Sequence, residues 1–191
     1  NQSEWWRKSN GYCLKHRGDT CHVAPTGTRC HAAYQGDLAP ALIACGASVE
    51  LAGPRGTRTI ALEDLYRDDG LAPLALEPGA LVVAVAVPAQ PRGAMSAYRK
   101  ARARGAIDFP LAGVAVRLAV DHGRIAAIDV ALTGTNSRPF RLAGTAAFSW
   151  RIVPTPWLKS SAAWMRRKCV SGAKRAVSAS RLSCAAALQI T

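Results

Sequence analysis

The sequence predicts an α+β fold, in which short helices accompany antiparallel strands. A helix is expected over residues 37–46, where an apolar run follows Asp37, a residue type that favours helix N-termini. A hairpin is expected over residues 48–60, because a glycine- and proline-rich turn separates two extended runs. Three further strand-like runs follow, at residues 96–104, 112–120 and 124–133. They predict an antiparallel sheet in the second half of the chain.

The remaining elements follow from local composition. Asp37 is expected to act as the N-cap of its helix, and residues 61–66 predict a short helix from their three- to four-residue apolar spacing. Residues 81–87 form a continuous apolar run, which is typical of a strand covered on both faces. Two prolines and a glycine within residues 88–93 indicate a domain boundary. The second sheet needs a covering helix, and no segment between that boundary and Phe148 predicts one.

The net charge of +13 is unevenly distributed over the 191 residues. Residues 1–148 hold 17 basic and 12 acidic residues, whereas residues 149–191 hold eight basic residues and no acidic one. A basic tail is compatible with RNA or anionic membranes, but a solvated end is the simpler interpretation, so we expect no nucleic-acid partner. The abrupt loss of acidic residues leaves two interpretations of residues 149–191 open, a basic helical extension or a shifted reading frame.

Other bulk features bear on location. The chain has no run of about 18 apolar residues, and therefore no expected membrane span. It has no starting methionine and no signal peptide, from which we expect a fragment of a longer protein. Six cysteines without a secretory signal favour a reducing, cytoplasmic location over a disulfide framework.

Three cysteines near the N-terminus are the clearest candidate for chemistry. Cys13, Cys21 and Cys30 are separated by glycine, proline and polar residues, which build no packed core of their own. Zinc sites usually contain closely spaced cysteine pairs, so gaps of seven and eight residues fit an iron–sulfur cluster better. Three ligands are one fewer than the usual four, and three unrelated thiols remain the alternative. The neighbouring histidines, His16, His22 and His31, could ligate but are expected to be solvent-facing loop residues.

A second constellation lies in the first strand-like run of the second half. Tyr98, Lys100, Arg102 and Arg104 alternate, so a strand would place one ring and three cations on one face. Such a face suits a phosphate-bearing or electron-rich cofactor, and a solvated edge strand with Asp108 as counter-charge explains it equally well. No arrangement typical of a hydrolase or kinase is present, and no catalytic residue is assigned.

These motifs together resemble a known family. Residues 37–51, Ser96-x-Tyr98-x-Lys100 and Asp108 are similar to the flavin-binding subunit of the molybdenum hydroxylases, which include xanthine dehydrogenase and carbon monoxide dehydrogenase. One branch, the beta subunit of 4-hydroxybenzoyl-CoA reductase, is indicated by the three cysteines, by Tyr66-Arg67-Asp68-Asp69-Gly70 and by residues 104–113. The resemblance covers about residues 1–146, and the match is lost soon after Gly134-Thr135-Asn136-Ser137-Arg138-Pro139.

The resemblance implies two cofactors in this subunit. Asp37 and Lys100 match residues at FAD, and Cys13, Cys21 and Cys30 match the last three of four ligands of an extra [4Fe-4S] cluster. In the family, the first ligand and the glycine-rich loop for the FAD pyrophosphate lie further upstream. We therefore expect this chain to bind FAD weakly and to be inactive alone.

The resemblance also implies a place in an oxidoreductase complex. Ferredoxin would supply electrons, which pass through the cluster and FAD to [2Fe-2S] centres and a molybdenum cofactor on two partner subunits of a heterotrimer. There, 4-hydroxybenzoyl-CoA would be reduced to benzoyl-CoA during anaerobic aromatic degradation; whether the heterotrimer dimerises stays open. The alternative is the flavin subunit of another molybdenum hydroxylase, which has no cysteine loop.

Four segments follow from this resemblance. They are an iron–sulfur loop insertion (1–36), the C-terminal part of a PCMH-type FAD-binding domain (37–90), an incomplete CO dehydrogenase flavoprotein C-terminal-type domain (91–148) and a basic tail (149–191).

Overall fold

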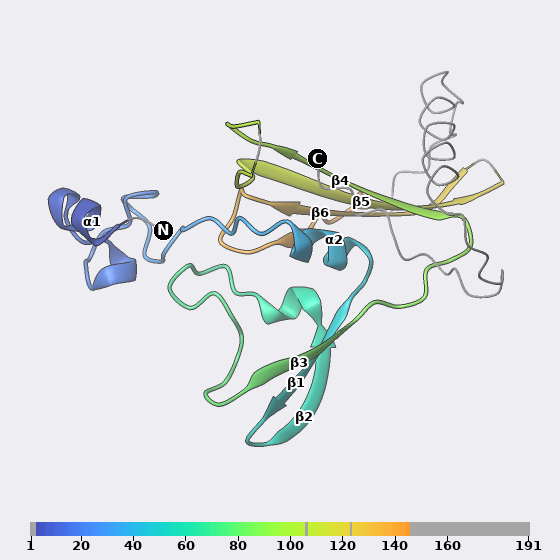
Figure 1. Cartoon of the computed structure of the whole chain (residues 1–191), viewed down its shortest axis with the longest axis horizontal. Helices are drawn as coiled ribbons and strands as arrows, with labels where there is room; N and C mark the ends of the chain where they lie inside the picture. Colours follow the sequence, from blue (N-terminus) through green and yellow to red (C-terminus); the bar gives the residue numbers. More distant parts are fainter. Residues whose placement is uncertain (1–2, 106, 123, 146–191) are drawn as a thin grey trace, which may run out of the picture.

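The computed structural model describes residues 3–105, 107–122 and 124–145, so the basic tail lies outside the described residues. Two antiparallel sheets and an N-terminal module make up this part of the chain, and α2 (Leu38–Ala44) lies between the sheets (Figure 1). This mixture of helices and antiparallel strands confirms the predicted α+β fold.

The first sheet has the strand order β2-β1-β3. The predicted hairpin is confirmed as β1 (Ser48–Gly53) and β2 (Gly56–Ala61), and the short helix after it is a 3-10 helix, η2 (Leu62–Leu65). The prediction that residues 81–87 form a doubly covered strand is wrong. β3 (Leu81–Ala86) is exposed along its whole length, because it is an edge strand that pairs only with β1 within the described residues.

The second sheet has the strand order β4-β5-β6-β7. It is formed by β4 (Ala94–Ala101), β5 (Ala112–Asp121), β6 (Arg124–Thr133) and β7 (Phe140–Arg141). The predicted antiparallel sheet and its β5–β6 hairpin are confirmed. β4 ends at Ala101, earlier than the predicted strand, and this changes the position of the cations that follow.

The second sheet does have a covering helix, contrary to the expectation from its own sequence. α2, from the first half of the chain, packs on β5 and β6. This packing could not be predicted from sequence order, since the helix precedes the first sheet along the chain. Asp37 does occupy the N-cap position of α2, as predicted, but its side chain makes no capping hydrogen bond.

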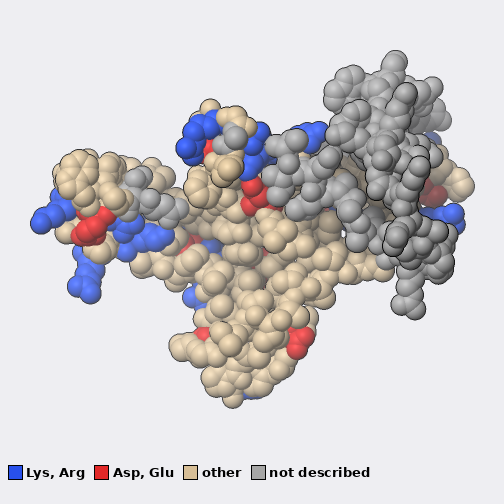
Figure 2. Space-filling view, viewed as in Figure 1, with Lys and Arg blue, Asp and Glu red and all other residues tan. Residues whose placement is uncertain are grey.

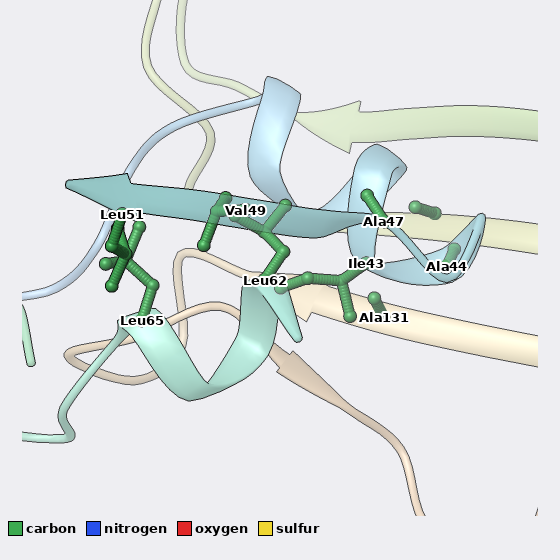
Figure 3. Close-up of a cluster of buried hydrophobic side chains, with 9 residues drawn as sticks. Ile43, Ala44, Ala47, Val49, Leu51, Leu62, Leu65 and Ala131 are labelled. Carbon is green, nitrogen blue, oxygen red and sulfur yellow. The ribbon is translucent and has the colours of Figure 1, made fainter. Parts of the chain in front are cut away.

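One hydrophobic cluster joins the two sheets (Figure 3). It contains buried residues of α2, β1, η2, β5 and β6, namely Ile43, Ala44, Ala47, Val49, Leu51, Leu62, Leu65, Ala115 and Ala131. Ile43 and Val49 are almost completely buried, at 1% and 0% exposed. The cluster therefore takes residues from both sides of the predicted boundary at residues 88–93.

The N-terminal module contains little regular structure. It begins with α1 (Glu4–Asn10), capped by the Ser3 hydroxyl, and continues through the 3-10 helix η1 (Leu14–His16). In Figure 1 the module extends from one end of the two-sheet body. No helix among the described residues is long and apolar enough to cross a membrane.

Candidate cofactor sites

The three predicted cluster ligands line one cavity of about 380 Å³, here called the thiol hollow. Cys21 and Cys30 are buried, and Cys13 is half-buried. The structure therefore brings the three thiols to one cavity, although Cys13 and Cys30 are 17 positions apart along the chain. Arg7 and Lys15 also line the hollow, and Figure 2 shows further Lys and Arg side chains on this module.

The backbone around Cys21 favours the thiolate. Burial raises the pKa of this thiol, but hydrogen bonds from the backbone N–H groups of Ala24, His31 and Val23 lower it by more. The net pKa lies below the ordinary value for cysteine. Hydrogen bonds of this kind to sulfur are also among the features that tune protein-bound iron–sulfur clusters.

The described residues form no site for a single metal ion. No group of three or more His, Cys, Asp or Glu side chains in the described ranges is placed to hold one metal ion. A single zinc ion would require all sulfur ligands within about 2.3 Å of one point. A cluster binds each thiolate through a different iron atom, so its ligands surround a larger volume. The three cysteines line one cavity, and any cluster there belongs to the proposal below.

One of the three nearby histidines, His22, lines the thiol hollow, and two of them make contacts of their own. His22 is exposed, and its Nε2 lies 2.9 Å from the Gly11 carbonyl oxygen. His16 Nε2 lies 3.3 Å from a Glu4 carboxylate oxygen. His22 is thus an exposed loop residue as expected, whereas His16 ends the 3-10 helix η1 and is half-buried.

The two residues predicted to contact a flavin are in direct contact with each other. Lys100 Nζ donates to Asp37 Oδ2 at 2.6 Å and to the Asp108 carbonyl oxygen at 2.9 Å. The Tyr98 hydroxyl donates to the other oxygen, Asp37 Oδ1, at 2.7 Å. Both oxygens of the Asp37 carboxylate thus accept hydrogen bonds from β4 side chains, which explains why this carboxylate does not cap α2. Tyr98 and Lys100 do share one face of β4, as the alternation predicts.

A glycine on the neighbouring strand makes room for this contact. Gly113 pairs with Lys100 in the β4–β5 ladder, and a side chain at position 113 would collide with the Tyr98 hydroxyl and with Thr133. Burial, followed by the hydrogen bond to Asp37, raises the pKa of Tyr98 above its ordinary value of 10. The phenol therefore remains a hydrogen-bond donor over the whole neutral range.

A cavity of about 510 Å³, here called the basic pocket, opens beside this pair. Its lining residues are Gln35, Asp37, Lys100, Arg102, Ile107, Asp108 and Phe109. Arg102 thus joins Lys100, as the sequence predicts. Arg104 does not line the pocket, and its guanidinium pairs instead with Asp108 at 2.9 Å. This confirms Asp108 as a counter-charge, and the hydrogen bonds from Arg104 hold its pKa below the usual range.

Sequence reasoning left three lining residues without a role. Ile107 and Phe109 are 98% and 66% exposed, although they are large and apolar. Large apolar residues in a polar turn are a sequence signal that could have predicted these two as binding residues. Gln35 lines both the basic pocket and the thiol hollow, so the two cavities share a wall. The sequence around Gln35 has no feature that predicts its place between two cavities.

Comparison with known proteins shows what parts of the chain are similar to. Residues 23–90 match the family of FAD-binding domains in molybdopterin dehydrogenase. The chain is 37% identical over 105 residues to the carbon monoxide dehydrogenase medium chain of Afipia carboxidovorans, covering 54% of this chain and 35% of that protein. Part of the chain is thus similar to the FAD-binding domain of molybdopterin dehydrogenases, and the chain spans about a third of the length of this curated relative.

Solved structures agree with this relationship. A cyanide-inactivated Cu,Mo-CO dehydrogenase is 32% identical, with a TM-score of 0.51 over 55% of this chain and 36% of the other. Reconstituted CO dehydrogenase from Oligotropha carboxidovorans is also 32% identical, with a TM-score of 0.50 over 59% and 41%. Quinoline 2-oxidoreductase from Pseudomonas putida 86 is 22% identical, with a TM-score of 0.55 over 74% and 47%, and shows the shared fold.

The match to the FAD-binding domain includes some candidate residues and omits others. Cys30 and Asp37 fall within residues 23–90, whereas Cys13, Cys21 and Lys100 fall outside. The basic pocket itself has groups that suit FAD. Its fixed Asp37–Lys100 ion pair and Arg102 provide charge for phosphate or an electron-rich ring, and its exposed apolar side chains provide a surface for a planar ring system.

Proposed function

We propose that this chain is part of an electron-transfer FAD subunit that also holds a [4Fe-4S] cluster, of the 4-hydroxybenzoyl-CoA reductase type. The observation that supports this most directly is the adjacency of two cavities. The thiol hollow and the basic pocket share Gln35, so two redox groups bound there would lie next to each other. A subunit that only binds flavin has no need of a cavity lined by three thiols.

The residues have separate roles under this proposal. Cys13, Cys21 and Cys30 supply three thiolate ligands, and a fourth comes from outside this set. Lys100 and Asp37 line the FAD site, where their ion pair holds the Lys100 ammonium in a fixed position. FAD supplies the redox chemistry when bound. The protein positions the two groups and excludes water between them.

The wider assembly is part of the same proposal. The partners would be a molybdenum subunit and a [2Fe-2S] subunit, with ferredoxin as electron donor in the cytoplasm. The four segments 1–36, 37–90, 91–148 and 149–191 would correspond to cluster loop, FAD-binding domain, second domain and tail. Reduction of 4-hydroxybenzoyl-CoA would occur on the molybdenum subunit, away from this chain.

Fluorescence titration of FAD with the full chain tests the flavin site. We expect weak but saturable binding, weakened about tenfold by Lys100→Met, since one charge-assisted hydrogen-bonding group is lost. Arg99→Met is the matched control, because Arg99 is the neighbouring cation on β4 and does not line the basic pocket. Equal affinity of wild type and Lys100→Met would show that FAD binds elsewhere.

A second candidate is the flavin subunit of another molybdenum hydroxylase, without a cluster. It is supported by the 37% identity to a carbon monoxide dehydrogenase medium chain. Both candidates predict FAD binding, and only the first predicts iron and acid-labile sulfide at the thiol hollow. Anaerobic reconstitution followed by iron and sulfide analysis therefore separates them.

A further inference from the structure

Two motifs that the proposed function leaves unused meet at Cys30. One is Tyr66-Arg67-Asp68-Asp69-Gly70, which follows η2. The other is the segment that connects β6 to β7 and contains Ser137. Both are distant from the thiol module along the chain, yet both form hydrogen bonds to the backbone or side chains around Cys30.

The Cys30 carbonyl oxygen accepts two hydrogen bonds. The backbone N–H of Gly70 donates to it at 2.9 Å, and the Ser137 hydroxyl donates at 3.2 Å. Cys30 and Ser137 are 6% and 5% exposed, so water contributes little to this contact. A buried carbonyl with two donors is held firmly, because breaking either bond leaves a buried polar group unsatisfied.

Asp68 connects the two motifs to the thiol module. Its Oδ1 accepts from the Ser137 backbone N–H at 3.1 Å, and its Oδ2 lies 2.8 Å from Arg29 NH1, one residue before Cys30. Burial raises the pKa of Asp68, but the hydrogen bond and charge of Arg29 and the Ser137 N–H lower it by more. The carboxylate therefore stays ionised at neutral pH, where it forms an ion pair with Arg29 and accepts a hydrogen bond from Ser137.

Gly70 packs directly against the sulfur. A Cβ atom at position 70 would lie 2.8 Å from Cys30 Sγ and 2.8 Å from Ala32 Cβ. Only glycine permits this approach, so the last position of the motif closes the space beside the thiol.

The other two thiols are held differently. Cys21 is held by backbone N–H groups of its own loop, and the Cys13 carbonyl accepts from His16 and Gly18 of the same loop. Cys30 alone of the three has hydrogen bonds to segments after residue 65 in the described chain.

We propose that Asp68, Gly70 and Ser137 are positioning residues that hold Cys30 at the thiol hollow. We call these three residues the Cys30 clamp. Because the clamp comes from both halves of the body, the third thiol reaches its place only when those halves are folded together. The role toward a cluster rests on the proposed function, whereas the effect on Cys30 itself does not.

Alkylation of the reduced, metal-free full chain tests the clamp without any cofactor. Iodoacetamide labelling, resolved for each cysteine by mass spectrometry, should show Cys30 reacting about tenfold faster in Asp68→Asn and in Ser137→Ala, with Cys21 unchanged. Asp69→Asn is the matched control, since Asp69 of the same motif accepts from the Leu71 N–H and contacts neither Arg29 nor Ser137 within the described residues. Ser137→Thr keeps the hydroxyl and should restore the slow rate.

Metal binding provides the second readout. After anaerobic reconstitution with ferrous iron and sulfide, clamp variants should bind iron about 10- to 100-fold more weakly than Asp69→Asn. If no variant and no wild-type chain binds iron while the alkylation pattern holds, the clamp stands and the proposed cluster fails. Wild-type alkylation of Cys30 in both Asp68→Asn and Ser137→Ala would overturn the clamp. So would an equal rise at all three thiols in both variants, because it would indicate general loosening.

Discussion

At the scale of single residues, the Asp37 carboxylate connects the two halves of the body. It stands at the start of α2 and accepts hydrogen bonds from Tyr98 and Lys100 on β4, 61 and 63 positions away. The Lys100 side chain is only 10% exposed, so the ion pair is screened less by water than a surface pair. Removing Asp37 would leave the nearly buried Lys100 ammonium without its counter-charge, which is destabilising.

Tyr98 should therefore titrate differently when Asp37 is changed. Its raised pKa means that the folded state keeps the phenolic proton beyond pH 10, so its contribution to stability is complete below pH 10 and is lost as the pH rises further. Asp37→Asn removes the negative charge and should lower the pKa of Tyr98 relative to wild type. NMR titration with ring-labelled tyrosine measures this directly. An unchanged Tyr98 titration in the variant would contradict the contact between Tyr98 and Asp37.

The candidate site was predictable from sequence only in part. Alternation along β4 correctly places Tyr98 and Lys100 on one face, because side-chain direction in a strand is a local property. The prediction that Arg104 shares this face was wrong, since β4 ends three residues earlier and Arg104 forms a local ion pair with Asp108. The shared wall at Gln35 depends on how distant segments pack, which no local pattern contains.

At the scale of elements, α2 determines how the body is assembled. Its seven residues supply Ile43 and Ala44 to a cluster that includes β1 of one sheet and β5 and β6 of the other (Figure 3). The strands themselves were predictable from alternation and turn residues. The covering role of α2 was not, because a helix pattern shows which residues are apolar but does not show which sheet they will cover.

Ile43→Ala should lower the free energy of unfolding by about 2–5 kcal/mol, because it leaves a cavity at a fully buried position. Urea denaturation followed by circular dichroism measures the change. Leu71→Ala is the control, since Leu71 is 57% exposed and its loss should change stability by less than about 0.5 kcal/mol. A loss for Ile43→Ala as small as that of the control would contradict the central place of α2 in the core.

At the scale of the whole molecule, the described chain has two adjacent cavities and one core that crosses the predicted domain boundary. The similarity to FAD-binding subunits of molybdopterin dehydrogenases concerns the body. The thiol hollow lies in the N-terminal module, and only part of that module falls within the family match. The central claim is therefore that this module carries a redox cluster beside the flavin site.

The most direct test is anaerobic reconstitution of the full chain with ferrous iron, sulfide and a small thiol that can supply the fourth ligand. Iron and acid-labile sulfide are then measured in the wild type, in Cys21→Ser and in Cys45→Ser, whose cysteine lies outside the thiol hollow. The account predicts about four irons and four sulfides per chain in the wild type and in Cys45→Ser, and loss of both in Cys21→Ser. Full iron and sulfide content in Cys21→Ser would contradict it.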